Sequence, residues 1–501
     1  MALEQYLELY NTSENRLINE AYKDVVFAIR GLEQIEEIVD VENFKYELTV
    51  KVNGYAKAVL KCPPIDKIGV FNIEQVIQDF CITDKSGYAK RNTTESSFDA
   101  IGFNAKPHAV HQIDAYCRNR DNLNRISFEI GCSFYNADNG NFAPSKPTPI
   151  NSTKYIYNRY YFWNAVRQHQ YGDVTNFEQY ILDGGTKKFL TNFTFVNHRI
   201  RTNDYHTLAF FNGNFCLTSG GSTHGGHQNN AVCYNSRVNR VYANLFDADG
   251  NSIVQGYVDN NNVNGGTTIN PPLYSNNYNQ LHPYIEDEGL LYVGVGPANI
   301  LDKKWVTNAG APFTLAQFQQ ASYYKVWAAG SPNPNDKHSE IYHFDMQQDD
   351  CKGYETIRLA YLNRVGAWDY YNFTKKSTQI TEITRSNFKQ FYGYNPYEVG
   401  GKAAGIGNYW DYGTYDGGTK TYNVNAINTV EANSNWIRED EALLLEELFT
   451  SPDTYMQTEN GDYIPVVVTE KDYTKQTKVN DKLIQYVISV QYGHETRIQR
   501  L

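Results

Sequence analysis

Alternating apolar and polar residues predict the first strands of the chain. Apolar side chains occupy every second position from Phe44 to Val52, the dipeptide Asn53-Gly54 follows, and a second alternating run reaches Leu60. Asn-Gly is the pair of residues that a two-residue turn between antiparallel strands prefers. We therefore expect a hairpin of two half-buried strands here.

A short helix and further strands complete the predicted N-terminal domain. Apolar residues at positions 73, 76, 77 and 80 share one helical face, and Asn72 can cap that helix. Alternation returns from Ile126, and three prolines between positions 144 and 149 interrupt it. We expect an N-terminal β-sandwich domain, plugged by the helix, over residues 1–150.

The middle of the chain predicts an aromatic connecting segment and a second β-sandwich domain. Residues 151–188 are rich in aromatic side chains with a partly helical spacing, so we assign them to the connection. Residues 189–375 alternate again and contain turn sequences at Asp249-Gly250 and at residues 363–366. Residues 259–279 are rich in Asn and predict a long loop within this domain.

The C-terminal β region, residues 376–501, contains two distinct elements. Residues 391–422 are rich in Tyr and Gly and predict an extended arm, since glycine disfavours a regular core. Residues 436–449 have the acidic first turns and the leucine-rich face of a helix, which Ser434 or Asn435 can cap. The alternation that follows predicts strands packed against this helix.

Composition supports the same fold class. The 501 residues include 41 Tyr and 25 Phe, and only 20% are charged. Tyr and Phe favour strands. The chain is therefore expected to be mainly β, with several antiparallel β-sandwich domains of immunoglobulin- or fibronectin-like type, few short helices and one longer C-terminal helix.

Charge and cysteine content exclude several function classes. The formal net charge is −11, whereas binding to nucleic acid phosphates requires clustered cations, so we expect no specific binding of nucleic acid. No apolar run is long enough for a membrane span, and the first residues lack the pattern of a signal peptide. We therefore expect neither membrane insertion nor secretion. The seven cysteines contain no Cys-x-x-Cys pair and predict neither a disulfide framework nor a zinc site.

The sequence contains few candidate metal ligands or catalytic residues. His224 and His227 are weak candidate metal ligands, because glycines lie between them and no third ligand is identifiable. The sequence contains no nucleotide-binding glycine loop, no serine-nucleophile motif and no assignable carboxylate pair. We therefore expect no catalytic residue, no cofactor and no enzymatic activity.

Aromatic residues on the glycine-rich arm form the candidate interaction site. Tyr and Trp on such a scaffold can stack on sugar rings or form protein interfaces at low entropic cost. The alternative is that these rings fill gaps between the β domains. The candidates are Tyr394, Tyr397, Tyr409, Trp410, Tyr412, Tyr415 and, outside the arm, Trp368.

Several stretches of the sequence together resemble a known group of proteins. They are residues 43–46 with the Asn53-Gly54 hairpin, and residues 69–73, 189–192, 358–373, 447–452 and 463–466. This combination resembles the tail-region virion proteins of tailed bacteriophages, especially crAss-like and related phages of Bacteroidota. The resemblance spans most of the chain.

This resemblance implies a structural protein of the virion. It implies a ring, hub or fibre-adaptor subunit that forms a symmetric oligomer in the tail after assembly in the cytoplasm of the host bacterium. Its partners would be copies of itself and other tail proteins, with tail fibres or host-surface glycans as further partners. Two alternatives stay open: a carbohydrate-binding host-recognition adhesin of the virion, and a glycan-degrading enzyme.

Overall fold

The fold is that of a mainly β protein, as the composition predicts. The computed structural model describes residues 7–11, 18–31, 44–53, 55–83, 86–87, 108–113, 116–119, 122–136, 141–145, 160–166, 177–191, 198–216, 233–236, 238–260, 289–301, 304–347, 354–390, 417–438, 442–470, 483–494 and 496–497. The chain divides into two compact units, Met1–Asp350 with Ala360–Tyr371, and Cys351–Leu359 with Asn372–Leu501. No helix in the described ranges has the length and apolar composition needed to cross a bilayer.

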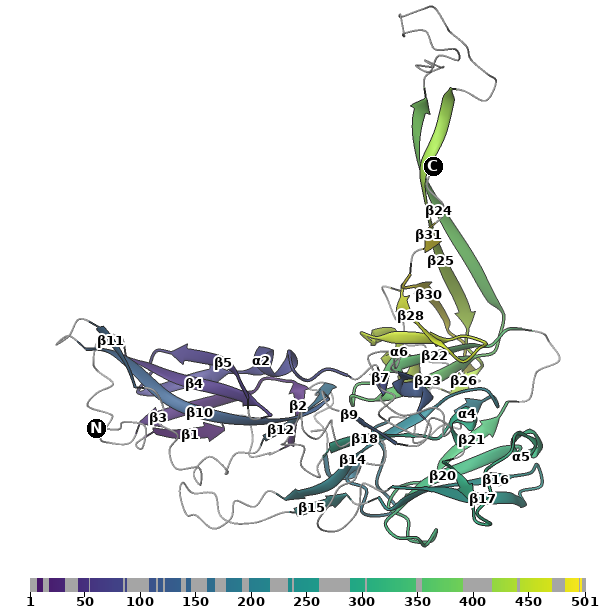
Figure 1. The fold of residues 1–501 in the computed structure, drawn as a ribbon, viewed down its shortest axis with the longest axis horizontal. Helices are drawn as coiled ribbons and strands as arrows, with labels where there is room; N and C mark the ends of the chain where they lie inside the picture. Colours follow the sequence, from purple (N-terminus) through teal and green to yellow (C-terminus); the bar gives the residue numbers. More distant parts are fainter. Residues whose placement is uncertain are drawn as a thin grey trace, which may run out of the picture. The chain divides into compact units, whose positions relative to one another are not determined.

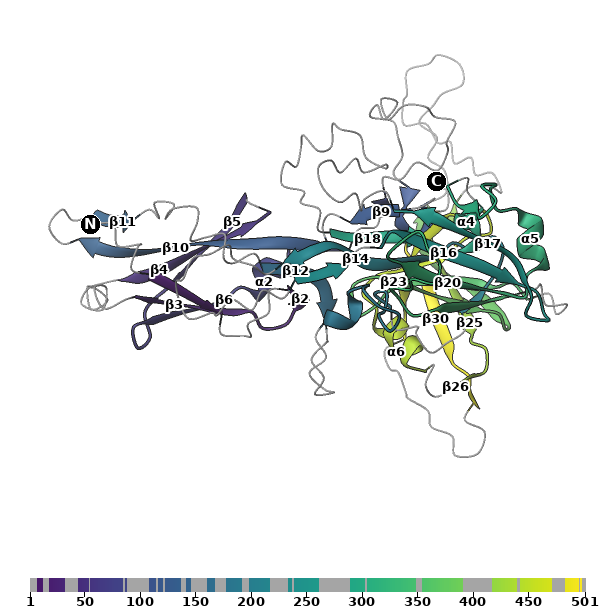
Figure 2. The same ribbon diagram turned by 90° about the horizontal axis from the view of Figure 1, so that it is seen from below.

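The first unit contains a sandwich of two sheets built largely from its N-terminal strands. One sheet is ordered β1-β3-β6 and the other β2-β12-β10-β4-β5, with β11 beside β10. Their bounds are β1 (Leu7–Asn11), β2 (Ile18–Tyr22), β3 (Val26–Gly31), β4 (Lys45–Val52), β5 (Tyr55–Cys62), β6 (Ile68–Asn72), β10 (Leu123–Asn136), β11 (Asn141–Ser145) and β12 (Tyr160–Val166). Figure 2 shows β10 and β5 in one layer and β3 and β6 in the other. Phe27, Leu48 and Phe128 lie in the core between them.

The first predicted hairpin and the short helix are confirmed. Val52 at the end of β4 pairs with Tyr55 at the start of β5, and Asn53 between them has a positive φ of 49°. Burial alternates along the whole of β4, as the sequence pattern requires. The helix α2 (Glu74–Gln78) follows β6, and Asn72 Oδ1 accepts a hydrogen bond from the Glu74 N–H at 3.0 Å.

A second sandwich in the first unit packs a four-stranded sheet on a six-stranded sheet. The orders are β15-β14-β18-β9 and β13-β21-β20-β16-β17-β19. The strands are β9 (Tyr116–Asn119), β13 (His198–Ile200), β14 (Thr207–Cys216), β15 (Cys233–Ser236), β16 (Arg240–Phe246), β17 (Ser252–Asp259), β18 (Gly289–Gly294), β19 (Val306–Thr307), β20 (Tyr323–Ala329) and β21 (Tyr342–Met346). Leu208, Val241 and Tyr324 lie in the core that the two sheets enclose.

Short elements lie between the longer strands along the chain. They are β7 (Ser86–Gly87), β8 (His108–Ala109), α4 (Pro297–Ile300), α5 (Leu315–Gln320) and the 3-10 turns η3 (Val110–Gln112) and η5 (Phe177–Tyr180). The turn sequence at Asp249-Gly250 joins β16 to β17 as predicted, and Gly250 has a φ of 84°. Thr314 caps α5 with a reciprocal pair of hydrogen bonds to Gln317.

Two strand pairs are parallel, so the prediction of purely antiparallel sandwiches is wrong at these places. β12 pairs in parallel with β2, and β13 pairs in parallel with β21. Both pairs join segments that are far apart in the sequence, so no tight turn dictates an antiparallel direction. Because Tyr160–Val166 is a strand of the first sandwich, buried in all but its last residue, the predicted connecting segment also contributes to a sheet and is not partly helical there.

The second unit is built on a larger sheet with the order β23-β22-β27-β28-β30-β25-β24, in which β31 pairs with β25 (Figure 1). The strands are β22 (Ile357–Leu362), β23 (Trp368–Phe373), β24 (Ser377–Gln390), β25 (Gly418–Asn433), β27 (Thr454–Gln457), β28 (Tyr463–Val468), β30 (Val487–Tyr492) and β31 (Thr496–Arg497). The boundary between the units passes through β22 and β23. The predicted turn at residues 363–366 joins these two strands, and Gly366 has a φ of 80°.

The C-terminal helix is shorter than the predicted span of residues 436–449. α6 covers Ala442–Thr450, whereas Ile437–Arg438 forms β26, which pairs with β29 (Leu483–Ile484). Ser434 does not cap a helix, because its Oγ accepts a hydrogen bond from the Tyr486 N–H at 2.8 Å. Pairing with the C-terminal strands thus replaces the first turns of the predicted helix.

Some predictions fall on residues that the structure does not describe. These are most of the Asn-rich stretch, residues 261–279, and most of the Tyr/Gly-rich arm, residues 391–416. The last part of that predicted arm is a strand, because β25 begins at Gly418. The domain boundaries expected at residues 150 and 188 stay predictions, and the C-terminal unit resumes at Asn372.

Candidate interaction surfaces

Most of the site residues predicted from sequence lie outside the described ranges. These are Tyr394, Tyr397, Tyr409, Trp410, Tyr412, Tyr415, His224 and His227. Trp368 is described: it is 1% exposed, and its ring lies edge-on to that of His111 with 4.8 Å between centroids. The predicted interaction role of Trp368 is therefore replaced by a role in packing the interior.

The chemically reactive side chains that the first unit gathers belong to its core. Tyr370 Oη lies 2.7 Å from His111 Nδ1 and 2.8 Å from Thr207 Oγ1. The ring of His206 packs on the ring of Tyr370, with 4.4 Å between the two centroids. All four residues are buried. Across the described segments, no group of three or more His, Cys, Asp or Glu side chains is arranged to hold a metal ion. Hydrogen bonding and ring packing thus account for this cluster.

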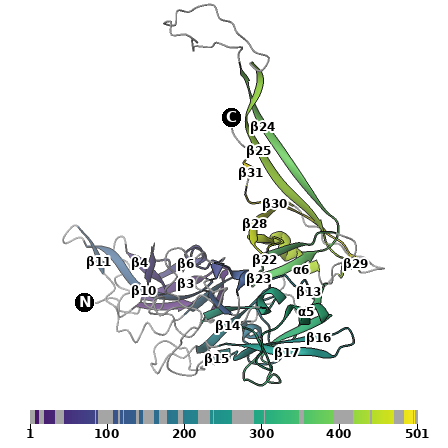
Figure 3. The ribbon, with the colours of Figure 1, turned by 45° about the vertical axis from the view of Figure 1, so that its right-hand side comes forward.

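The first exposed feature is the β24–β25 hairpin of the second unit (Figure 3). β24 has 14 residues, all of them paired with β25 from Ser377 opposite Ala432 to Gln390 opposite Gly418. At about 3.4 Å per residue, the ribbon is about 48 Å long, whereas most strands have three to ten residues. Thr381 Oγ1 donates to Asn428 Oδ1 across the strands at 2.7 Å.

Both edges of this hairpin are open over much of its length. β24 is the last strand of its sheet, and its outer side has no partner among the described residues. The other side of β25 is covered by β30 at residues 429–433 and by β31 at residues 425–426. Residues 418–424 of β25 have no second partner strand in the described part of the chain. Among the described residues, the outer half of the hairpin is therefore a two-stranded ribbon that no further strand pairs with on either edge.

Apolar side chains remain exposed on both faces of the hairpin. Ile380 and Phe388 alternate onto one face and Ile383 onto the other, and each is more than two-fifths exposed. Tyr422 is the extra residue of a β-bulge, since Asn423 pairs with Ser386 and Thr421 with Asn387. A two-stranded hairpin without a packed face is at best marginally stable in water.

The second exposed feature is the outer face of the six-stranded sheet, which we call the aromatic face. Successive side chains of a strand point to opposite faces of the sheet. Val241, Leu245 and Val326 point into the sandwich interior, so the residues next to them in the sequence point outward. The aromatic face carries two transverse rows of aromatic rings separated by a polar row. The members are Tyr257, Tyr242 and Trp327, then Gln255, Asn244, Lys325 and His343, then Phe246, Tyr323 and Asp345.

The two rings of the outermost row stack on each other, and the second of them also stacks on His343 of the polar row. The Phe246 and Tyr323 rings are 4.9 Å apart with an interplanar angle of 10°, and Tyr323 and His343 are 4.6 Å apart at 16°. Lys325 Nζ lies 5.1 Å from the centroid of Phe246 and 5.6 Å from that of Tyr323. Asp345 Oδ1 lies 2.9 Å from His343 Nε2 and so orients the imidazole.

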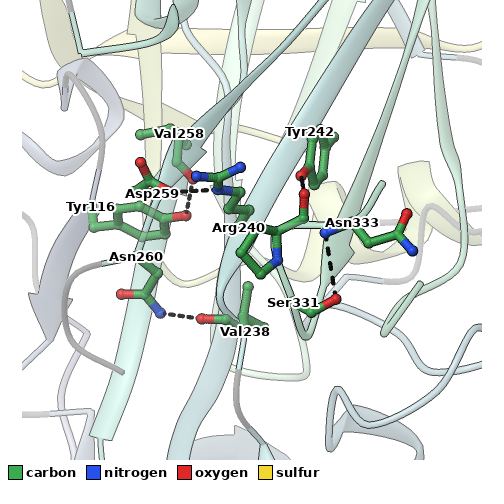
Figure 4. A network of polar contacts seen from close by, with 10 residues as sticks. Tyr116, Val238, Arg240, Tyr242, Val258, Asp259, Asn260, Ser331 and Asn333 are labelled. Carbon is green, nitrogen blue, oxygen red and sulfur yellow. Dashed lines mark hydrogen bonds and ion pairs between the residues drawn. The ribbon is translucent and has the colours of Figure 1, made fainter. Parts of the chain in front are cut away.

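The other aromatic row is covered by a loop, residues 330–337. Tyr242 Oη donates to the Pro332 carbonyl at 2.7 Å, and Trp327 Nε1 donates to the Pro334 carbonyl at 2.9 Å. As a result Tyr242 is 1% exposed. Figure 4 shows Tyr242 reaching towards this loop, in which the Asn333 N–H donates to Ser331 Oγ. The loop therefore closes one half of the aromatic face. In the other half, which we call the open half, Phe246, Tyr323 and His343 remain partly exposed, and no loop of the described residues hydrogen-bonds over them.

Polar contacts also join β16 to β17 at the end of the aromatic face where β16 begins (Figure 4). Arg240 Nε lies 2.5 Å from Asp259 Oδ1, and its guanidinium lies 3.8 Å from the centroid of the Tyr257 ring. Although partial burial opposes it, hydrogen bonding to Tyr242 and Asp259 and the charge of Asp259 raise the pKa of Arg240. At the other end, the Asp247 carboxylate accepts the N–H groups of Asp249 and Asn251 and closes the turn. The Asp247 carboxylate thus stabilises the turn between β16 and β17.

Alkaline pH is expected to destabilise the first unit through Tyr116, whose hydroxyl donates to the Val258 carbonyl at 3.1 Å. Burial, and next the charge of Asp259, raise the pKa of Tyr116 well above its ordinary value of 10.0. The unfolded chain loses this proton near the ordinary value while the folded chain retains it. The contribution is therefore complete below the ordinary pKa and is lost as the pH rises through the folded pKa.

Urea unfolding at neutral and at stepwise higher pH measures this loss. Tyr116→Phe is expected to make the stability of the first unit less sensitive to alkaline pH. The matched control is Tyr55→Phe, since Tyr55 is 51% exposed. An unchanged pH dependence in Tyr116→Phe would show that the phenol does not couple to folding.

Sequence analysis missed the aromatic face, although a signal for it was present. Tyr242, Asn244 and Phe246 alternate with core residues in one strand, and Tyr323, Lys325 and Trp327 do so in another. A period of two places each set on one face of its strand. Only the register between β16 and β20, which sets Tyr242 opposite Trp327 and Phe246 opposite Tyr323, brings the two sets together.

Comparison with known proteins adds no relative from which a function could be transferred. The sequence matches no model of a known protein family and no curated protein.

Proposed function

We propose that this chain is a structural subunit of a bacteriophage tail, where copies of it join into a symmetric oligomer. The observation that carries the proposal is the β24–β25 hairpin, in which all of β24 and residues 418–424 of β25 have an outer edge that no strand in the described ranges pairs with. Open edges present unpaired N–H and C=O groups to any strand that can pair with them. The resemblance of the sequence to tail-region virion proteins favours the same role.

The two edges are suited to joining identical copies in a ring. When hairpins lie side by side and point the same way, β24 of one copy lies antiparallel to β25 of the next. Such a head-to-tail contact uses two different edges, and it closes into a ring when the rotation between copies allows it. Each copy would then cover the open edges of its neighbours and stabilise a ribbon that is marginal alone.

Shortening the hairpin tests this assembly directly. Residues 387–422 are deleted, and Ser386 is joined to Asn423 through Asn-Gly, because these two residues are paired and a two-residue turn fits between them. Wild-type protein is expected to be oligomeric at micromolar concentration by light scattering coupled to gel filtration. The shortened variant is expected to be monomeric, with an unchanged circular dichroism spectrum apart from the lost strands.

A matched variant separates the edges from the aromatic arm. Deleting residues 391–417 and joining Gln390 to Gly418 through Asn-Gly removes the arm but keeps β24 and β25 complete. This variant is expected to remain oligomeric. A monomeric wild-type protein, or loss of assembly in the arm-deleted variant, would refute assembly through the edges.

The remaining features of the proposal follow from the sequence. The subunit would act as a ring, hub or fibre adaptor in the virion tail, assembled in the host cytoplasm with other tail proteins, without catalytic activity or a cofactor. Its sandwiches would be of immunoglobulin- or fibronectin-like type. The alternative is a carbohydrate-binding adhesin of the virion. Electron microscopy of virions labelled against this chain distinguishes tail-axis density from a peripheral adhesin.

A further inference from the structure

We propose that the open half of the aromatic face binds an oligosaccharide that carries a single carboxylate. This half consists of Asn244, Phe246, Tyr323, Lys325 and His343. It belongs to the six-stranded sheet of the first unit and includes no residue of the hairpin. The proposal therefore does not depend on assembly of a tail.

The charge on this half favours an anionic group. Lys325 takes part in none of the ion pairs found among the described residues, whereas Arg240 is paired with Asp259 and His343 with Asp345. Its ammonium lies above two stacked rings. A cation over aromatic rings keeps its positive charge, because the rings attract it without neutralising it. One ammonium that no carboxylate of the described residues pairs with is complementary to one carboxylate.

The polar groups beside Lys325 are suited to sugar hydroxyls. Asn244 Oδ1 accepts a hydrogen bond from Ser252 Oγ at 2.6 Å, which orients the amide with its NH2 group as a donor. His343 Nε2 is bound to the Asp345 carboxylate, so in the neutral imidazole Nδ1 is an acceptor. A hydroxyl group both donates and accepts, and can satisfy an amide donor and an imidazole acceptor side by side. A sulfate or chloride ion can only accept.

The side chains are already ordered, which lowers the entropic cost of binding. Phe246, Tyr323 and His343 hold one another by stacking. The loop at residues 330–337 covers one end of the face, and hydrogen bonds to the Asp247 carboxylate close the turn at the other.

Saturation-transfer NMR titrations with two matched probes test the proposal. The acidic probe is aldotetraouronic acid, which carries one carboxylate on xylotriose, and the neutral probe is xylotetraose. We expect the acidic probe to bind at least about tenfold more tightly, because a hydrogen bond to a charged group is the stronger kind. Lys325→Gln is expected to weaken binding of the acidic probe at least about tenfold and to leave the neutral probe unchanged.

Lys57→Gln is the matched control. Lys57 Nζ lies 5.1 Å from the centroid of the Phe80 ring, so it is also a lysine above an aromatic ring, but on β5. The Lys57→Gln variant is expected to bind both probes as tightly as the wild-type protein does. Equal binding of the two probes, no binding of either, or equal loss in both lysine variants would overturn the proposal.

Two further outcomes would assign the face to another partner and also overturn the proposal. Tighter binding of a tetra-aspartate peptide than of the acidic sugar would indicate an acidic protein segment. A change in the mass of the protein in Lys325→Gln, measured by light scattering, would indicate that the face joins copies of this chain. The hairpin variants above provide the reference masses, so failure of the sugar site and failure of the assembly are read from different measurements.

Discussion

Replacing Asn363 with alanine is expected to lower the free energy of unfolding of the first unit by about 3 to 5 kcal/mol. Asn363 is buried in the turn between β22 and β23, and its amide makes four hydrogen bonds. Its Nδ2 donates to the Leu190 carbonyl at 3.0 Å and to Asp369 Oδ2 at 2.9 Å. Its Oδ1 accepts from the N–H groups of Val365 and Ala367.

The cost is large because alanine leaves all four partners buried without that amide. Unsatisfied buried groups lose their hydration and gain nothing in return. The buried Asp369 carboxylate would lose the donor Asn363 Nδ2 and keep the hydrogen bond from Thr191 Oγ1 at 2.6 Å. Urea unfolding monitored by fluorescence measures the change.

Two variants make this prediction specific. Asn363→Asp keeps the acceptor for both N–H groups but sets a carboxylate against Asp369 and the Leu190 carbonyl, so it is expected to be at least as destabilising at neutral pH. Asn335→Ala, at an exposed position in the loop over Trp327, is expected to change stability by no more than about 0.5 kcal/mol. A loss below about 1 kcal/mol in Asn363→Ala would contradict the hydrogen-bond argument.

Replacing Gly256 with alanine is expected to destabilise the first unit by about 3 kcal/mol. Gly256 lies in the middle of β17, and a Cβ atom there would lie 2.3 Å from the Val306 carbonyl oxygen and 2.5 Å from the Phe313 ring. The carbonyl belongs to β19, which pairs with β17 at this point. Since Phe313 is only 4% exposed, neither neighbour can move without disturbing the core.

Gly184→Ala is the matched control for this substitution. No heavy atom lies within 4 Å of the Cβ position at Gly184, and the backbone there does not require glycine. The free energy of unfolding of the Gly184→Ala variant is therefore expected to stay within about 0.5 kcal/mol of that of the wild type. Thermal unfolding measures both variants. If Gly256→Ala matched Gly184→Ala, β19 would have to be free to shift away from β17.

Helix propensity illustrates where sequence reasoning stops. Residues 436–449 carry a helical pattern, and its later part forms α6. Ile437 is instead buried in β26 opposite Ile484, and Ser434 binds the backbone of Tyr486. Those partners lie some fifty residues further along the chain. A preference of a few tenths of a kcal/mol per residue for helix is smaller than the gain from burying an isoleucine against a strand.

The same limit applies to the candidate surfaces. Tyr and Trp in the sequence indicate aromatic surfaces but do not reveal which rings are exposed: Trp368 is 1% exposed, whereas Phe246 and Tyr323 border the open half of the aromatic face. A strand pattern identifies one face of a strand, and burial depends on what packs against that face. Tyr242 is buried because the loop at residues 330–337 packs over it and accepts its hydrogen bond.

The sequence by itself determined the mainly β character and the local hairpins. Asn53 between β4 and β5, Gly250 between β16 and β17, and Gly366 between β22 and β23 all adopt the positive φ that their turns require. Contacts between neighbours in the chain set these features. Only the tertiary structure decided the parallel pairing of β2 with β12, the stacking of Phe246 on Tyr323, and the open edges of β24 and β25. These depend on the register and packing of segments distant in sequence, which no local pattern encodes.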